Sequence, residues 1–184
     1  MARTSAPFTL ELTLLGILER TPMHGYNLCK AVQALDGFDL VWKLKQSSLY
    51  ALVDKLEAAG LLAGDLVAGD THPSRKELRV TAAGKAALDA WVDSPVDSVR
   101  QMRQDFFARL YFARLTGPDR AKRLLQAQRL ACQGWRDNLL ERLGSPGGAY
   151  LGVVLSHRLR IVEATLAWLE TYEHSLGSGA PSAS

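Results

Sequence analysis

One stretch of the sequence, Ser47 to Gly60, gathers small hydroxyl, aromatic and cationic side chains within the pattern of a short helix. Ser47 or Ser48 can cap the start of the helix, and Gly60 can end it in a left-handed conformation. Spacings of i, i+3, i+4 and i+7 predict one apolar face, made of Leu49, Leu52, Val53 and Leu56. The remaining faces suit a DNA major groove, although an ordinary amphipathic helix has the same pattern.

Several side chains of this helix have the chemistry needed to read bases. Serine can bond to several bases, and an alanine methyl can meet a thymine methyl. We therefore assign base contacts to the exposed positions, which are Ser47, Ser48, Ala51 and Lys55. The hydroxyl of Tyr50 is assigned to a phosphate, because phosphate contacts fix register without reading sequence.

A second polar group lies between two predicted strands, 62–68 and Lys76–Val80, which alternate with period two. The turn carries Ser74, Arg75 and Lys76, with His72 nearby. This placement suits a wing that reaches a minor groove, where arginine responds to groove width and negative potential. A solvated turn is the alternative. Lys43 and Lys45, which precede the predicted helix, are either phosphate contacts or part of a solvated face.

The sequence predicts neither an enzyme nor a metal or cofactor site. Its four histidines are scattered, and it has no nucleophile elbow, metal-ligand spacing or glycine-rich phosphate loop. Cys29 and Cys132 lie far apart within helical patterns, so we expect two buried free thiols. No apolar run approaches the roughly 20 residues of a membrane span. The lack of a signal-peptide pattern favours the cytoplasm.

The charge is unevenly distributed between the two halves of the chain. The 184 residues carry a net charge of +3, but residues 1–93 hold ten Lys/Arg and eleven Asp/Glu. A DNA-binding half with a charge of −1 needs a local basic patch and, we expect, a second copy. Two recognition helices about 34–36 Å apart would then match a pseudo-palindromic operator.

The elements around the opening helix follow a recognisable order. Helices are predicted at Thr9–Arg20, His24–Leu35 and Ala82–Val92, the last capped by Thr81. Residues 38–46 form a connector whose apolar alternation allows a short strand. Three helices, a hairpin and a helix are the order of a winged helix-turn-helix, here at residues 1–93.

The second half is predicted to be helical, which makes the chain mostly α. Helices at Val99–Leu115, Pro118–Leu143 and Ala149–Leu176 form a three-helix domain at 99–176, and the tail 177–184 is predicted to be disordered. The last helix has an a/d seam: Leu155, Leu159, Val162, Leu166 and Leu169. The seam favours dimerisation, with the core of a monomeric bundle as the alternative.

Several runs, taken in order, carry a resemblance to a known family. They are Leu14-Leu-Gly-Ile-Leu18, Pro22-Met-His-Gly-Tyr26, Ser48-Leu-Tyr50, Leu56-Glu-Ala-Ala-Gly-Leu61 and Leu78-Arg-Val-Thr-Ala-Ala-Gly84. With them the chain resembles the PadR family of transcriptional regulators. The resemblance implies a DNA-binding winged helix, a homodimer formed through C-terminal helices, and repression that a small aromatic or hydrophobic effector often relieves. It also implies that Tyr26 and Asn27, and more weakly Lys30, lie near the DNA backbone; a core aromatic is the alternative for Tyr26.

The chain departs from the family pattern at the start of the recognition helix. Gln46, Ser47 and Ala51 stand where many members have two prolines and a glycine. Together with Trp42, this resembles the virulence-activator-like branch, which has a long helical C-terminal domain. Both repression and activation stay open on this branch.

Two further alternatives concern the effector and the function as a whole. Aromatic residues that could line an effector pocket, between the domains or at a dimer interface, are Phe106, Phe107, Tyr111, Trp135 and Trp168. The same residues could simply pack a helical domain. The rival to a DNA-binding regulator is a protein-interaction adaptor built on a winged helix that does not bind DNA. The near-neutral first half supports that rival.

Overall fold

A computed structural model describes residues 9–35, 46–67 and 75–177 of the chain. The chain divides into two compact units, Met1–Val92 and Asp93–Ser184, which are described separately. Most of the predicted connector, including Trp42, Lys43 and Lys45, lies outside the described residues, as do His72, Ser74 and the tail beyond residue 177. Within the described residues no helix has the length and hydropathy needed to cross a membrane.

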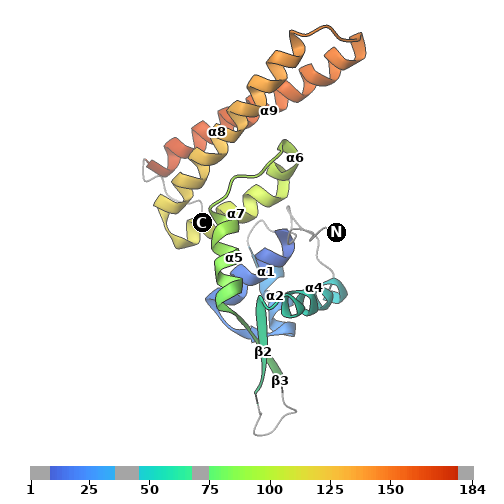
Figure 1. The fold of residues 1–184 in the computed structure, drawn as a ribbon. Helices are drawn as coiled ribbons and strands as arrows, with labels where there is room; N and C mark the ends of the chain where they lie inside the picture. The colour runs from blue at the N-terminus through green and yellow to red at the C-terminus, as the bar shows by residue number, and fades with distance from the viewer. Residues whose placement is uncertain (1–8, 36–45, 68–74, 178–184) are drawn as a thin grey trace. The chain divides into compact units, whose positions relative to one another are not determined.

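The first unit has the element order of a winged helix-turn-helix, as predicted (Figure 1). Its elements are α1 (Thr9–Arg20), β1 (Met23–His24), α2 (Gly25–Gln33), α4 (Gln46–Ala58), β2 (Leu62–Val67), β3 (Arg75–Val80) and α5 (Ala82–Val92). The strand β1 was not predicted. It pairs antiparallel with β3, so the sheet has three strands in the order β1-β3-β2, and the predicted second helix begins one residue late and ends at Gln33.

Helix α1 forms the centre of this unit. It is buried at every residue from Glu11 to Leu18 and contacts α2, α4, α5 and β3. The predicted apolar face of α4 is buried at Leu49, Val53 and Leu56. Burial of this stripe fixes which side of α4 is left for solvent or a ligand.

The helices on either side of the wing have the predicted caps, at the end of α4 and at the start of α5. Gly60 has φ +70, and the N–H groups of Gly60 and Leu61 donate to the carbonyls of Glu57 and Leu56, each at 2.9 Å. This is the Schellman arrangement that ends helices. After the wing, Thr81 Oγ1 accepts from Gly84 N at 3.0 Å and starts α5. The wing is therefore fixed to α4 and α5 at its base.

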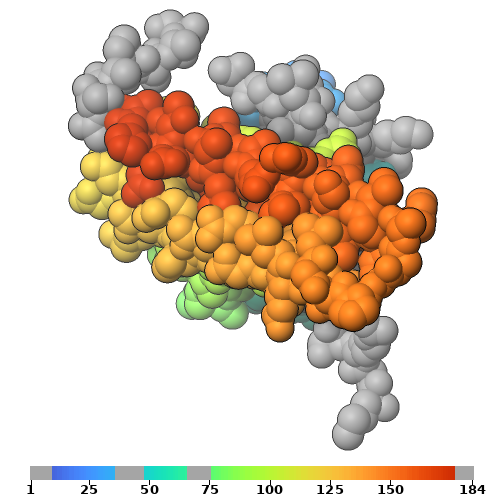
Figure 2. Space-filling view, turned by 90° about the horizontal axis from the view of Figure 1, so that it is seen from above, coloured from blue at the N-terminus to red at the C-terminus, as the bar shows by residue number. Residues whose placement is uncertain are grey.

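The second unit is all helical in its described part. It contains α6 (Val99–Gln101), the π-helical turn η1 (Met102–Phe106), α7 (Phe107–Thr116), α8 (Pro118–Leu143) and α9 (Ala149–Gly177). The helix predicted without interruption from Val99 is thus broken by a widened turn. Helices α8 and α9 lie side by side along their length (Figures 1 and 2).

The predicted dimerisation seam lies inside this unit. Leu155, Val162 and Leu169 are buried, and Leu159 and Leu166 are half-buried, where α9 packs against α8. These three side chains are thus already covered within the single chain, and their role in dimerisation stays a prediction. The bundle core, which the spacing left open, explains them.

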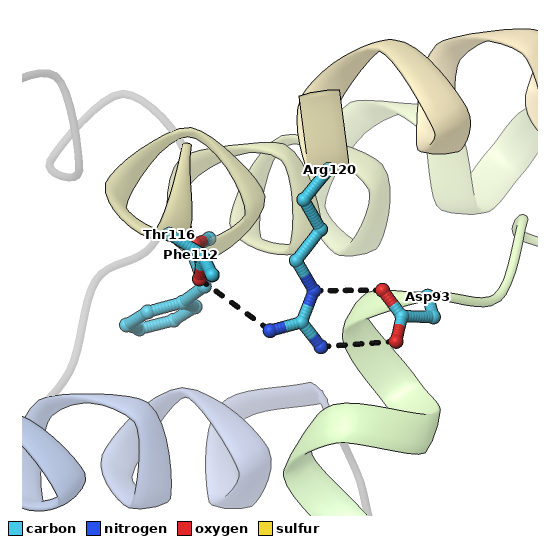
Figure 3. Close-up of polar contacts among 4 residues, drawn as sticks. All are labelled: Asp93, Phe112, Thr116 and Arg120. Atoms are coloured by element: carbon cyan, nitrogen blue, oxygen red, sulfur yellow. Dashed lines mark hydrogen bonds and ion pairs between the residues drawn. The ribbon is translucent and has the colours of Figure 1, made fainter. Parts of the chain in front are cut away.

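Three polar side chains hold the segment 93–98 on the second unit. Arg120 forms a two-pronged ion pair with Asp93, at 2.7 and 3.1 Å, and approaches Thr116 Oγ1 at 3.4 Å (Figure 3). Gln128 Oε1 accepts from Val96 N at 2.7 Å, in a buried position. Buried backbone N–H groups need hydrogen-bond acceptors. Val96 lies outside any helix or strand, so the side chain of Gln128 provides the acceptor that its N–H group needs.

Arg109 completes this anchor, donating from Nη1 to the carbonyl of Ser94 at 2.7 Å. Burial lowers the pKa of Arg109, against the opposing effect of Asp105 and Asp97. The two cysteines are buried free thiols, as predicted, and burial raises the pKa of Cys132.

Candidate nucleic-acid interface

Four of the predicted DNA-binding residues line one hollow in the first unit. The hollow has a volume of about 500 Å³ and is lined by His24, Gly25, Tyr26, Asn27, Tyr50 and Lys76. These residues come from β1 and the start of α2, from α4 and from β3, which are three separate parts of the sequence. The fold thus brings together side chains that the sequence analysis could select only one at a time.

The two tyrosines of the hollow are exposed. Tyr26 is 55% and Tyr50 is 45% exposed, so the structure rules out the core-aromatic alternative for Tyr26. Lys30 Nζ lies over the Tyr26 ring, 4.7 Å from its centroid, in a cation–π contact. This contact keeps a positive charge beside the exposed Tyr26 ring.

The His-Gly-Tyr run has a local structural explanation. A Cβ at Gly25 would lie 3.0 Å from Tyr50 Cε1, so the glycine lets the Tyr50 ring approach the start of α2. His24 Nδ1 lies 3.0 Å from the carbonyl oxygen of Lys76, which joins the same position to the wing. These two contacts hold α2, α4 and β3 together around the hollow.

The outer face of α4 contains the predicted base-reading positions. Ser48 and Ala51 are exposed, whereas the side chain of Ser47 lies outside the described residues. Lys55 is exposed too, but its Nζ lies 2.7 Å from Oε1 of the buried Glu11. Its ammonium is engaged by α1, and a base contact would have to compete with that ion pair.

The wing cations are also paired within the chain. Lys76 Nζ lies 2.7 Å from Glu57 Oε2, and Arg79 Nε lies 2.6 Å from Asp65 Oδ2. The hydrogen bond to Asp65 raises the pKa of Arg79. Arg75 begins β3 opposite Val67, but its side chain, like the rest of the wing tip, lies outside the described residues.

Sequence reasoning missed the acidic partners of these cations. Glu11 and Glu57 lie 44 and 19 residues from Lys55 and Lys76, so no local spacing connects them. Gly25 and Gly64 were also missed as packing positions. A glycine in a strand pattern was the one available signal, since it can mark the close approach of another group.

The predicted effector residues divide into those at or beside one groove and those away from it. A groove of about 600 Å³ in the second unit is lined by Val99, Met102, Arg103, Phe107, His157, Arg160, Ile161, Ala164, Thr165 and Trp168. Phe107 and Trp168 are ring neighbours at 5.4 Å, and the buried Phe106 contacts both. Tyr111, which pairs with Phe112, and Trp135 do not line this groove.

The part of the chain that the structure describes contains no candidate metal site. No group of three His, Cys, Asp or Glu side chains there could hold an ion.

Comparison with known proteins finds one matching family model, within the first unit. Residues 14–90 match the model of the transcriptional regulator PadR-like family. Comparison with curated proteins gives no match. The assignment to the virulence-activator-like branch stays a prediction.

Solved structures similar to the chain come from the same family. One is Bacillus subtilis PadR in complex with operator DNA, at 20% identity and TM-score 0.45, covering 90% of this chain and 96% of that one. A PadR-like regulator from Bacillus cereus has 18% identity and TM-score 0.44, covering 96% and 99%. Bacillus subtilis PadR in complex with p-coumaric acid has 21% identity and TM-score 0.42, covering 92% and 99%.

Proposed function

We propose that this chain, which belongs to the PadR-like family of transcriptional regulators through residues 14–90, binds double-stranded DNA as a homodimer and represses transcription. The observation that carries the proposal is the hollow in which Tyr26, Asn27, Tyr50 and Lys76 meet. Two exposed phenols, an amide and a cation that converge from three elements suit a phosphate of the DNA backbone.

In the proposed complex α4 enters the major groove. The exposed Ser48 and Ala51 face the base edges, and the tyrosines at either side of the α2–α4 junction contact phosphates. Small side chains at the base-reading positions read few bases directly, so part of the specificity comes from DNA shape.

Dimerisation is proposed on a second face of α9. Tyr150, Val153, Ile161 and Trp168 are exposed, and the helical repeat places them opposite the buried seam. Phe107 lies beside Trp168, but the apolar residues that α8 leaves exposed on this face favour a second subunit as a further partner. Two copies would also double the cationic contacts that one near-neutral first unit offers.

An effector site is proposed in the groove lined by Phe107 and Trp168. Its apolar walls suit a planar aromatic or hydrophobic compound, and a partner subunit on the exposed face of α9 would close it. An effector bound there would change the affinity for the operator by altering how the two protomers are arranged.

The rival function, a protein-interaction adaptor, is favoured by the ion pairs of Lys55, Lys76 and Arg79 with acidic residues of the same chain. Salt dependence separates the two functions, because neutralised phosphates make log K fall linearly with log salt. An adaptor that does not bind DNA would give no salt-dependent shift.

The decisive experiment is a mobility shift with the protein's own upstream region at several salt concentrations, for the wild type and Tyr50→Phe. Tyr50→Phe keeps the ring on Gly25 but removes the hydroxyl. We expect it to weaken binding by about 1–3 kcal/mol over two protomers, at about 0.5–1.5 kcal/mol per hydrogen bond. Tyr111→Phe, in the second unit, is the control and should bind as the wild type does.

The same assay tests the effector when phenolic and planar compounds are added, since release of the DNA fragment is the expected result. Absence of any salt-dependent shift by the wild type would leave the adaptor as the better function.

A further inference from the structure

We propose that Glu57 limits the affinity of this protein for non-specific DNA by holding the ammonium group of Lys76 in an ion pair. A phosphate can use Lys76 fully only when this pair opens. The inference rests on the proposed function, DNA binding through α2, α4 and the wing, and it assigns to Glu57 a role in setting specificity.

The ion pair joins the end of α4 to the wing. Lys76 Nζ and Glu57 Oε2 are 2.7 Å apart, with side chains 49% and 21% exposed. Side chains alternate along a strand, so Lys76 shares the sheet face of the buried Leu78 and points toward α4. Lys76 also lines the hollow with both tyrosines, which places its charge where DNA would bind.

The path of the lysine side chain depends on a glycine. A Cβ at Gly64 would stand 2.1 Å from Lys76 Cε and 2.7 Å from Glu57 Oε1. The side chain therefore passes over the backbone of β2 in space that any other residue would fill. This arrangement gives Gly64 a specific use, because it lets the cation lie along the sheet instead of extending from it.

The pair belongs to a wider pattern of neutralised cations. Lys55 is paired with Glu11, and Arg79 with Asp65, each within 2.7 Å. Non-specific DNA affinity comes almost entirely from cations that displace counterions, whereas base contacts add the specific part. Holding cations in internal pairs therefore weakens non-specific binding, which has little else to support it, while base contacts still hold the operator.

The test measures binding of the full-length protein to a non-specific duplex and to its upstream fragment across a salt series. Glu57→Gln removes the carboxylate charge and preserves the shape of the side chain. We expect log K against log salt to steepen by about 0.9 per protomer, or about 1.8 for a dimer. The dimer would then lose about 12-fold more affinity between about 50 and 200 mM salt.

Three comparisons separate this effect from a general change in charge. Glu19→Gln removes an equal charge from the Lys85–Glu19 pair between α1 and α5, which is 2.6 Å long, and should leave the slope unchanged. Lys76→Ala should abolish the effect of Glu57→Gln in the double variant. Gly64→Ala displaces Lys76 with no change in charge, so it should also steepen the slope and provides a second variant if Glu57→Gln folds poorly.

The inference is overturned if Glu57→Gln and Gly64→Ala both keep the wild-type slope, or if Glu57→Gln and Glu19→Gln steepen it equally. It is also overturned if the Glu57→Gln effect persists without Lys76. These results require a wild type that binds DNA, so they differ from failure of the proposed function, in which the wild type itself gives no salt-dependent binding.

Discussion

At the scale of single residues, Lys55 joins a contact that stabilises the fold to the role in DNA recognition that we propose for it. Its ammonium lies 2.7 Å from a carboxylate of Glu11 that is only 2% exposed, whereas Lys55 itself is 51% exposed. A buried carboxylate that loses its cation keeps the cost of desolvation without the compensating attraction. A change at Lys55 is therefore expected to affect the packing of α4 against α1 as well as the proposed DNA binding.

Lys55→Met, which keeps the apolar stem, should lower the free energy of unfolding by about 1–3 kcal/mol. The loss stays below that of a fully buried pair because solvent screens the exposed lysine. Urea denaturation measures it. The double variant Glu11→Gln/Lys55→Met should recover part of the loss, since the buried carboxylate charge is then removed together with the lysine. Wild-type stability of Lys55→Met would instead mean that Lys55 acts mainly on DNA.

The residues that sequence could identify are those whose role is set by near neighbours. Gly60 and Thr81 were predicted as caps because capping is decided within a few residues. Tyr26 and Tyr50 came from motifs, and the structure leaves both exposed. The pairing of Lys55 with Glu11 could not be predicted, because only the folded arrangement of α1 and α4 brings the two together.

At the scale of elements, the wing depends on how α4 ends. Gly60 has φ +70, a conformation in which L-residues are strained, and a Cβ there would meet no neighbour within 4 Å. Backbone strain is therefore the main cost of a substitution at this position.

Gly60→Ala should destabilise the protein by about 1–2 kcal/mol, the usual cost of the left-handed conformation. Gly60→Asn should lose less, because asparagine adopts this conformation more easily. Urea denaturation of the two variants beside the wild type gives the comparison. Equal stability of Gly60→Ala and the wild type would contradict the importance of the cap for the α4–wing connection.

Helices with a long periodic pattern of apolar residues could be predicted from the sequence. An element that exists only because another strand pairs with it was missed. The helices now seen as α8 and α9 have many turns of periodic sequence, and their positions were predicted closely. The two residues of β1 are a strand only because β3 lies beside them. The a/d seam of α9 identified a buried face correctly but could not say whether α8 or another chain buries it.

At the scale of the whole molecule, α9 has two apolar faces with different surroundings. One holds Leu155, Val162 and Leu169 against α8, and the other leaves Val153, Ile161 and Trp168 exposed. Monomeric proteins seldom expose aligned large apolar residues in this way. The proposed homodimer uses the second face, so the two faces respond differently to the same substitution.

Val153→Glu should shift the protein from dimer to monomer, because burying a carboxylate in an apolar interface without a partner is costly. Val153 is 65% exposed in the single chain, so the monomer should fold with wild-type stability. Sedimentation equilibrium measures the mass, and Ala86→Glu, an exposed position on α5 in the first unit, is the matched control. The monomer should also bind the upstream fragment with about half the salt slope of the dimer, since it contacts half the phosphates. A dimer that persists in Val153→Glu would place the interface elsewhere on the molecule.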